Sequence, residues 1–138
     1  IRQEVLINKI PFLGICLGMQ LIAGASEEGV RVRGLELIEA EVIRIADTRD
    51  IKIPHVGWNN VRHNGAGLFQ GIEENADFYF VHSYKVVSAD TSNRCFYTEH
   101  GGEVVAYIEK GNVYGTQFHP EKSQGSGLTM LRNFSALC

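Results

Sequence analysis

The chain has 138 residues, 44% hydrophobic and 21% charged, with a formal net charge of -3. This length suits one domain that buries about two thirds of its unfolded surface. The weak negative charge and the absence of a basic run give no electrostatic case for binding nucleic acid. No apolar run approaches the roughly 20 residues that span a bilayer. Three cysteines without metal-type spacing, Cys16, Cys95 and Cys138, fit a reducing cytosol better than a disulfide framework. We therefore expect a cytoplasmic domain with no metal, cofactor, nucleic-acid partner or membrane partner.

The expected elements alternate between helices and strands along the chain. In chain order they are a helix end at 1–9, a strand at 11–15, a helix at 17–25, a loop between Gly29 and Gly34, a strand at 36–45, a loop leading into a short strand at 56–61, a strand at 78–82, three short strands at 95–99, 104–109 and 113–118, and a helix at 127–134. This order predicts an α/β fold in one domain. Its helices should flank a sheet that is parallel around Cys16 and antiparallel later.

The most informative segment is residues 14–20, Gly-Ile-Cys-Leu-Gly-Met-Gln, which follow an apolar run. Small residues two before and two after Cys16 give the pattern of a sharp strand-to-helix turn that carries a nucleophile. Gly14 and Gly18 are expected because the turn is tight and backbone passes close by. A helix N-terminus would favour the thiolate. A free cysteine is also often a small buried hydrophobe, so this segment alone leaves both interpretations open.

A second segment, residues 115–123, reads Gly-Thr-Gln-Phe-His-Pro-Glu-Lys-Ser and supplies a candidate base. Pro120 biases His119 toward an extended conformation, in which residues two apart point to the same side. The Glu121 carboxylate should then reach the His119 ring. By itself this segment could be a polar turn at a strand end. Together with the cysteine turn it predicts a Cys16–His119–Glu121 triad for nucleophilic catalysis.

These two segments resemble those of the class I glutamine amidotransferases. The match extends over Ser-Glu-Glu at 26–28, Pro-His-Val-Gly-Trp-Asn at 54–59 and Phe-Tyr-Phe-Val-His-Ser-Tyr at 78–84, in the order typical of the family. Within it the chain is most similar to the glutaminase subunits of imidazole glycerol phosphate synthases. The resemblance implies a three-layer sandwich with a mixed sheet.

The resemblance also implies strands before Ile1. Residues 1–138 are then expected to be the C-terminal two-thirds of the glutamine amidotransferase domain, without its N-terminal part. In the family a glycine-rich loop from that part helps to form the oxyanion hole. From this we expect the chain by itself to be a weak or inactive glutaminase.

The resemblance implies hydrolysis of the glutamine side-chain amide through a thioester on Cys16, with His119 as acid and base and Glu121 orienting it. The backbone N–H of Leu17 follows the nucleophile and is expected in the oxyanion hole. Substrate contacts are implied for four residues: Gln20, one helical turn after Cys16, Glu28 at the substrate ammonium, and Ser83 and Tyr84 through their backbone. His82 is expected to be structural.

Ammonia released into water would be protonated, so such a glutaminase is expected to dock onto a synthase. The resemblance implies a (β/α)8 cyclase partner and L-glutamine as substrate. Its interface residues correspond to Trp58, Tyr79 and Lys122. An exposed Trp is a frequent interface anchor, although Trp58 could instead be part of the core.

Three alternatives stay open at this point. A related amidotransferase subunit could serve a synthase that amidates a surface sugar. A cysteine peptidase or deglycase could share the architecture, but it would not need an amino-acid cage made by Gln20, Glu28, Ser83 and Tyr84. The chain could also be an inactive interaction module.

Overall fold

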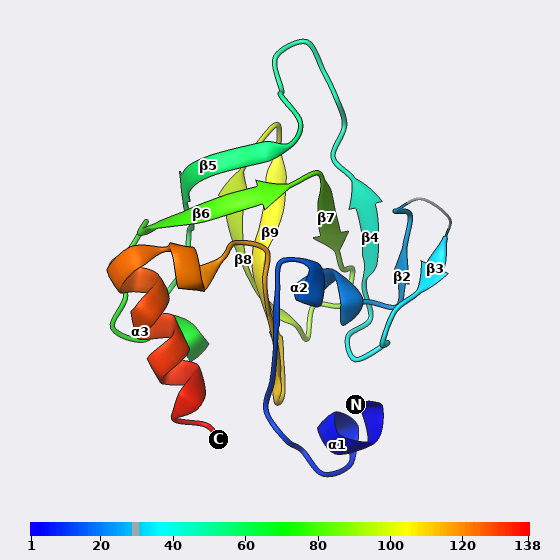
Figure 1. The fold of residues 1–138 in the computed structure, drawn as a ribbon, viewed down its shortest axis with the longest axis vertical. Helices are drawn as coiled ribbons and strands as arrows, with labels where there is room; N and C mark the ends of the chain where they lie inside the picture. Colours follow the sequence, from blue (N-terminus) through cyan, green and yellow to red (C-terminus); the bar gives the residue numbers. More distant parts are fainter. Residues whose placement is uncertain (29–30) are drawn as a thin grey trace.

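The computed structural model describes residues 1–28 and 31–138, so Gly29 of the predicted loop lies outside the described residues. The elements are α1 (Arg2–Leu6), β1 (Phe12–Ile15), α2 (Leu17–Leu21), β2 (Ala25–Ser26), β3 (Val32–Arg33), β4 (Glu41–Arg44), β5 (His55–Asn60), the 3-10 turn η1 (Gly67–Phe69), β6 (Asp77–His82), β7 (Tyr84–Val87), β8 (Arg94–Glu99), β9 (Glu103–Lys110), β10 (Val113–Thr116), the 3-10 turn η2 (Pro120–Lys122) and α3 (Gln124–Ser135) (Figure 1). In these ranges no helix is long and apolar enough to cross a membrane.

The central sheet has the order β1-β10-β9-β8. Strands β1 and β10 run parallel, with Ile15 opposite Thr116, so both end at the same edge of the sheet. The remaining pairs are antiparallel and are joined by tight turns at Gly101–Gly102 and at Gly111, where φ is positive. This confirms the predicted mixed sheet and the three short strands near the end of the chain.

Two further sheets were not predicted as such. One has the order β3-β2-β4-β7, and the other is the antiparallel pair β5-β6. The strand predicted at 36–45 is limited to β4, and the loop predicted at the start of 56–61 is strand β5. Strands as short as β2 and β3 have no periodicity to detect, and β5 contains Gly57 at φ +123°, a residue and conformation unusual in strands.

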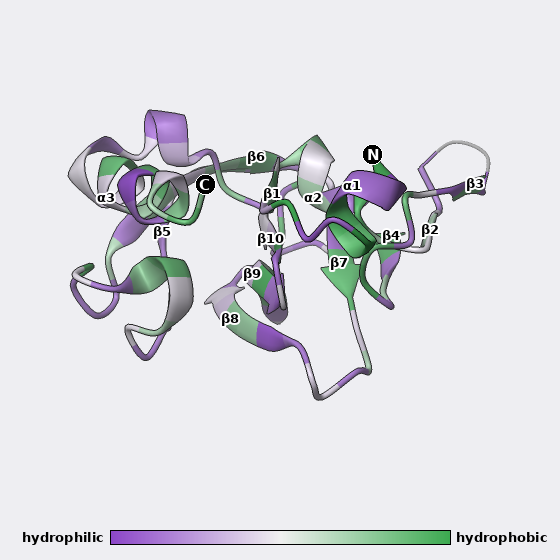
Figure 2. Ribbon diagram, turned by 90° about the horizontal axis from the view of Figure 1, so that it is seen from below, coloured by the Kyte–Doolittle hydropathy of each residue, from purple (hydrophilic) through white to green (hydrophobic). Residues whose placement is uncertain are grey.

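Within the described part of the chain, two apolar clusters form the core. One packs α2 against the sheet and includes Met19, Ile22 and Ile108. The other is aromatic and includes Phe69, Phe78 and Tyr107, with α3 packed beside it against η1, η2 and β6. Ile108 and Tyr107 are neighbours on β9, and their side chains belong to opposite clusters, as expected for successive residues of a strand. Figure 2 shows that α1 begins with hydrophilic residues and ends with apolar ones, of which Val5 joins the first cluster.

Candidate active site

Cys16 occupies a sharp turn between β1 and α2. It is the N-cap of α2 and has φ 50° and ψ -104°, a backbone conformation that residues other than glycine rarely adopt. A Cβ on Gly14 would lie 2.4 Å from the Gly18 carbonyl oxygen, whereas a Cβ on Gly18 would meet nothing within 4 Å. The close approach expected at both glycines therefore exists only at Gly14. The strand can turn directly into the helix because residue 14 has no side chain.

We expect Gly14→Ala to lower the free energy of unfolding by about 2–3 kcal/mol, because the new methyl group must displace backbone. Gly18→Ala is the matched control. It should leave stability within about 1 kcal/mol, and in the stabilising direction, because alanine is the better helix former. Urea unfolding of both variants measures the difference. Equal losses in the two variants would contradict the steric account of this turn.

His119 and Glu121 are in contact. The His119 Nδ1 and Glu121 Oε1 atoms are 2.6 Å apart, and His119 is extended at φ -98° and ψ 97°. Pro120 then begins the η2 turn, so the segment is not extended throughout as the sequence argument assumed. The turn still returns the carboxylate to the ring. Because Nδ1 faces the carboxylate, the Nε2 atom is left for proton transfer.

Strand β6 connects Cys16 with His119. The Cys16 thiol donates a hydrogen bond to the Val81 carbonyl, with 3.7 Å between Sγ and O, and the His119 N–H donates to the Tyr79 carbonyl at 2.9 Å. These two carbonyls are two residues apart on one strand, a spacing of about 7 Å. In the described residues no hydrogen bond joins Sγ directly to His119. Cys16 and His119 are thus both hydrogen-bonded to β6, and the thiol proton is directed to a carbonyl.

Burial raises the pKa of the Cys16 thiol above its ordinary value, and the Glu121 charge adds to this. Three smaller effects lower this pKa without cancelling the rise: the hydrogen bonds from the Leu17 backbone and from Gln117, and the charge of Lys122. The expected preference for thiolate at a helix N-terminus is therefore not met. Helix α2 has only five residues, and desolvation of the thiolate by burial is the largest cause acting on this pKa. The thiol needs a base at the moment of reaction.

Gln117 is a site residue that the sequence analysis missed. It is fully buried, and its Nε2 donates toward Cys16 Sγ at 3.8 Å. Its backbone N–H donates to the Ala106 carbonyl. Ala106 has no partner residue on β8, so the register between β8 and β9 shifts at this point. Its position two residues before the histidine is the only sequence signal that could have identified it.

The residues expected to hold the substrate lie at different depths. Gln20 is buried, and its Nε2 lies 3.4 Å from both the Tyr84 carbonyl and Gln117 Oε1. The Ser83 carbonyl is occupied by the N–H of Ile45. Glu28 is exposed, and its backbone N–H donates to Ser26 Oγ. The structure therefore brings Gln20 and Tyr84 together at the nucleophile and leaves the Glu28 carboxylate at the surface.

The outer face of the β5-β6 pair is apolar and exposed. Trp58 is 50% exposed, so it is not a core residue, and its ring packs edge-on against Tyr79 with 5.8 Å between centroids. The Lys122 ammonium lies 5.9 Å from the Tyr79 ring centroid. Val56 and Val81, opposite each other in the register, extend the same face and were not predicted. The three predicted interface residues are thus contiguous.

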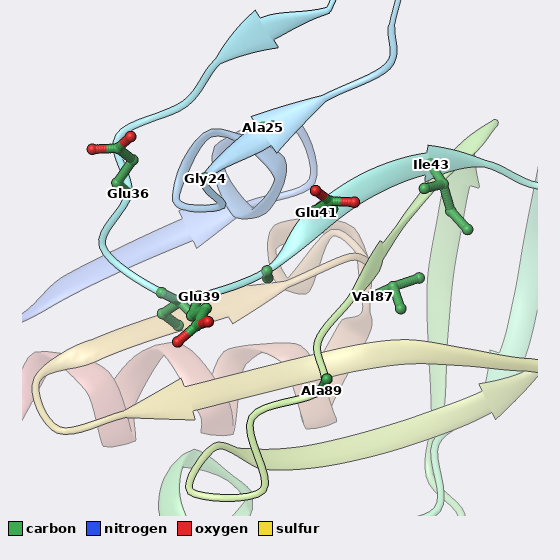
Figure 3. A pocket seen from close by; sticks show the side chains of 10 residues that line it. Gly24, Ala25, Glu36, Glu39, Glu41, Ile43, Val87 and Ala89 are labelled. Atoms are coloured by element: carbon green, nitrogen blue, oxygen red, sulfur yellow. The ribbon is translucent and has the colours of Figure 1, made fainter.

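A separate groove of about 630 Å³ lies beside β2, β4 and β7. Figure 3 shows Glu36, Glu39 and Glu41 around it with the apolar side chains of Ile43 and Val87. None of its described lining residues is a predicted site residue. No group of three or more His, Cys, Asp or Glu side chains that could hold a metal ion occurs in residues 1–28 and 31–138.

The sequence profile of the class-I glutamine amidotransferases matches residues 1–137, and the chain belongs to this family. It is 48% identical to imidazole glycerol phosphate synthase subunit HisH of Moorella thermoacetica, over 98% of this chain and 64% of that protein. Subunit HisH 1 of Campylobacter jejuni strain RM1221 is 44% identical over 99% and 68% of the two lengths. The chain thus spans about two thirds of these curated relatives.

The fold matches a solved structure as well. A putative GMP synthase protein from Thermoplasma acidophilum superposes with a TM-score of 0.69 at 24% identity, over 93% of this chain and 57% of that one. At this level of identity the likeness concerns the fold alone. The predicted family and the predicted α/β fold class are confirmed.

Proposed function

We propose that this chain provides the glutaminase site of a glutamine amidotransferase, which hydrolyses L-glutamine to glutamate and passes ammonia to a partner synthase. The proposal is supported by two contacts that follow the carboxyl ends of the adjacent parallel strands β1 and β10: Gln117 with Cys16, and His119 with Glu121. The HisH relatives favour an imidazole glycerol phosphate synthase in histidine biosynthesis as the assembly served.

In the proposed reaction, His119 takes the proton of the Cys16 thiol, and the sulfur attacks the γ-carbonyl carbon of glutamine. The Leu17 N–H supports the oxyanion of the tetrahedral adduct. The C–N bond then breaks, His119 protonates the leaving nitrogen, and ammonia departs from a glutamyl thioester. Water attacks the thioester with His119 again as base, releasing glutamate and restoring the thiol. The charge of Glu121 stabilises the imidazolium formed in between.

Labelling by a substrate analogue tests this function even where turnover is slow. L-glutamine in which a chloroketone replaces the amide should alkylate Cys16, as located by mass spectrometry of the digested chain. Added L-glutamine should protect the thiol, while D-glutamine should not. Equal labelling of Cys16, Cys95 and Cys138, or no protection by L-glutamine, would refute the proposed site.

We further propose that the face formed by Val56, Trp58, Tyr79 and Val81 docks onto a (β/α)8 cyclase subunit. Trp58→Ala should weaken association with that subunit by about thirtyfold, since buried Trp anchors commonly contribute 2 kcal/mol or more. Calorimetric titration measures the affinity. Val87→Ala removes another exposed apolar side chain, on β7, and should leave the affinity unchanged. The assignment would be wrong if the Trp58 variant bound the cyclase as tightly as the parent chain does. It would also be wrong if the parent chain bound a sugar-amidating synthase instead.

A further inference from the structure

Two histidines that the proposed reaction does not use form a buried pair beside the site. His55 on β5 and His82 on β6 face each other in the register and are 4% and 5% exposed. The His55 Nδ1 and His82 Nε2 atoms are 2.9 Å apart. The His55 ring also stacks between Phe80, at 4.7 Å, and His100, at 4.1 Å between centroids.

The hydrogen bonds of this pair define where each proton lies. The His82 Nδ1 is 2.7 Å from the Tyr84 carbonyl, which can only accept, so this Nδ1 carries a proton. In a neutral ring the His82 Nε2 is then an acceptor, so the His55 Nδ1 must donate to it. The His55 Nε2 accepts in turn from Asn59 Nδ2 at 3.2 Å, and the same amide donates to the Glu99 carbonyl at 2.9 Å.

Both rings are neutral in the folded chain. Burial is the main cause that lowers the pKa of His55 to about 3, with the charges of His82 and His100 adding to it. Burial likewise lowers the pKa of His82 to about 4, against the raising effect of its bond to the Tyr84 carbonyl. The His100 and His119 charges act on His82 in the same direction as burial.

The chain of hydrogen bonds continues to the nucleophile. The Tyr84 carbonyl that accepts from His82 also accepts from Gln20 Nε2, whose other proton points to Gln117 Oε1. With Oε1 turned to Gln20, the Gln117 amide must present its Nε2 to Cys16 Sγ. An inverted Gln117 amide would place an oxygen against the sulfur and would disfavour the thiolate.

We propose that His55 and His82 are positioning residues, which hold the Tyr84 carbonyl and through it the Gln20–Gln117 amide pair so that an N–H donor faces Cys16. The proposal rests on the proposed function in taking Cys16 as the nucleophile. In the described residues neither histidine is hydrogen-bonded to the Cys16 sulfur. Their effect is transmitted through the hydrogen bonds of the Tyr84 carbonyl, Gln20 and Gln117.

The first test measures the tautomers directly. Nitrogen-15 NMR of the unmodified chain at pH 7 should show His55 and His82 both neutral and both protonated at Nδ1. A proton on Nε2 of either ring would reverse a bond in the chain and would overturn the proposal. This measurement uses no variant and no glutamine.

The second test uses the pH dependence of Cys16 alkylation by iodoacetamide, read by mass spectrometry. Gln117→Leu removes the donor, so the apparent pKa of Cys16 should rise by about one unit. His55→Phe keeps the stacked ring but not the donor, and should raise that pKa by about half a unit, a threefold loss of thiolate. His55→Asn places its Nδ2 near the original Nδ1 position, and should preserve the pKa. His100→Phe is the control outside the chain.

The two replacements at His55 separate positioning from packing. If the ring merely fills space, the Phe variant should behave like the parent and the Asn variant should be impaired, which is the opposite order. The proposal is overturned if the apparent pKa of Cys16 is unchanged in His55→Phe, or if it shifts more in His55→Asn than in His55→Phe. Because no glutamine is used, failure here is distinct from failure of the glutaminase proposal, which the chloroketone labelling decides.

Discussion

Replacing Cys16 with alanine is expected to lower glutamine hydrolysis by at least about a thousandfold, since the attacking sulfur is lost. The fold should remain, because the side chain is only half-buried and alanine keeps the same Cβ in the turn. Glutamate release with the synthase present measures the loss. Supplied ammonia should still support the synthase, because its own site is untouched.

The matched control is Cys95→Ala. Cys95 is also half-buried and free, and burial raises its thiol pKa in the same direction, but it lies on β8. Its replacement should leave glutamate release unchanged. Parental turnover by the Cys16 variant would place the nucleophile elsewhere and would remove the basis of the proposed mechanism.

Glu121→Gln should lower kcat by about a hundredfold to ten-thousandfold with little change in KM, because the amide keeps the shape of the side chain but not the charge that stabilises imidazolium. The 2.6 Å contact with Nδ1 makes His119 the group affected. Steady-state kinetics over a range of glutamine concentrations separates the two constants.

Glu28→Gln is the informative comparison, because that carboxylate is exposed and is proposed to receive the substrate ammonium. It should raise KM more than it lowers kcat. A Glu121 variant with normal kcat, or one altered only in KM, would show that Glu121 does not act through His119.

Part of the candidate site and of the fold could be predicted from the sequence. The Cys16 turn and the His119–Glu121 contact depend on neighbours within a few positions, so Gly14, Gly18 and Pro120 indicated both. Strands β6 and β9 were also predictable, because both are continuous β-prone runs and β9 lies between glycine turns. The same local reasoning failed at Gly18, where open space replaces the expected close approach.

The amino-acid order by itself determined which reactive groups the chain carries and which of them lie close together along it. Only the tertiary structure decided what surrounds them. Gln117 meets Cys16 because β1 and β10 are adjacent, although 101 positions separate the two residues. His55 meets His82 because β5 pairs with β6. The raised pKa of Cys16 is likewise a property of burial, which the whole fold produces.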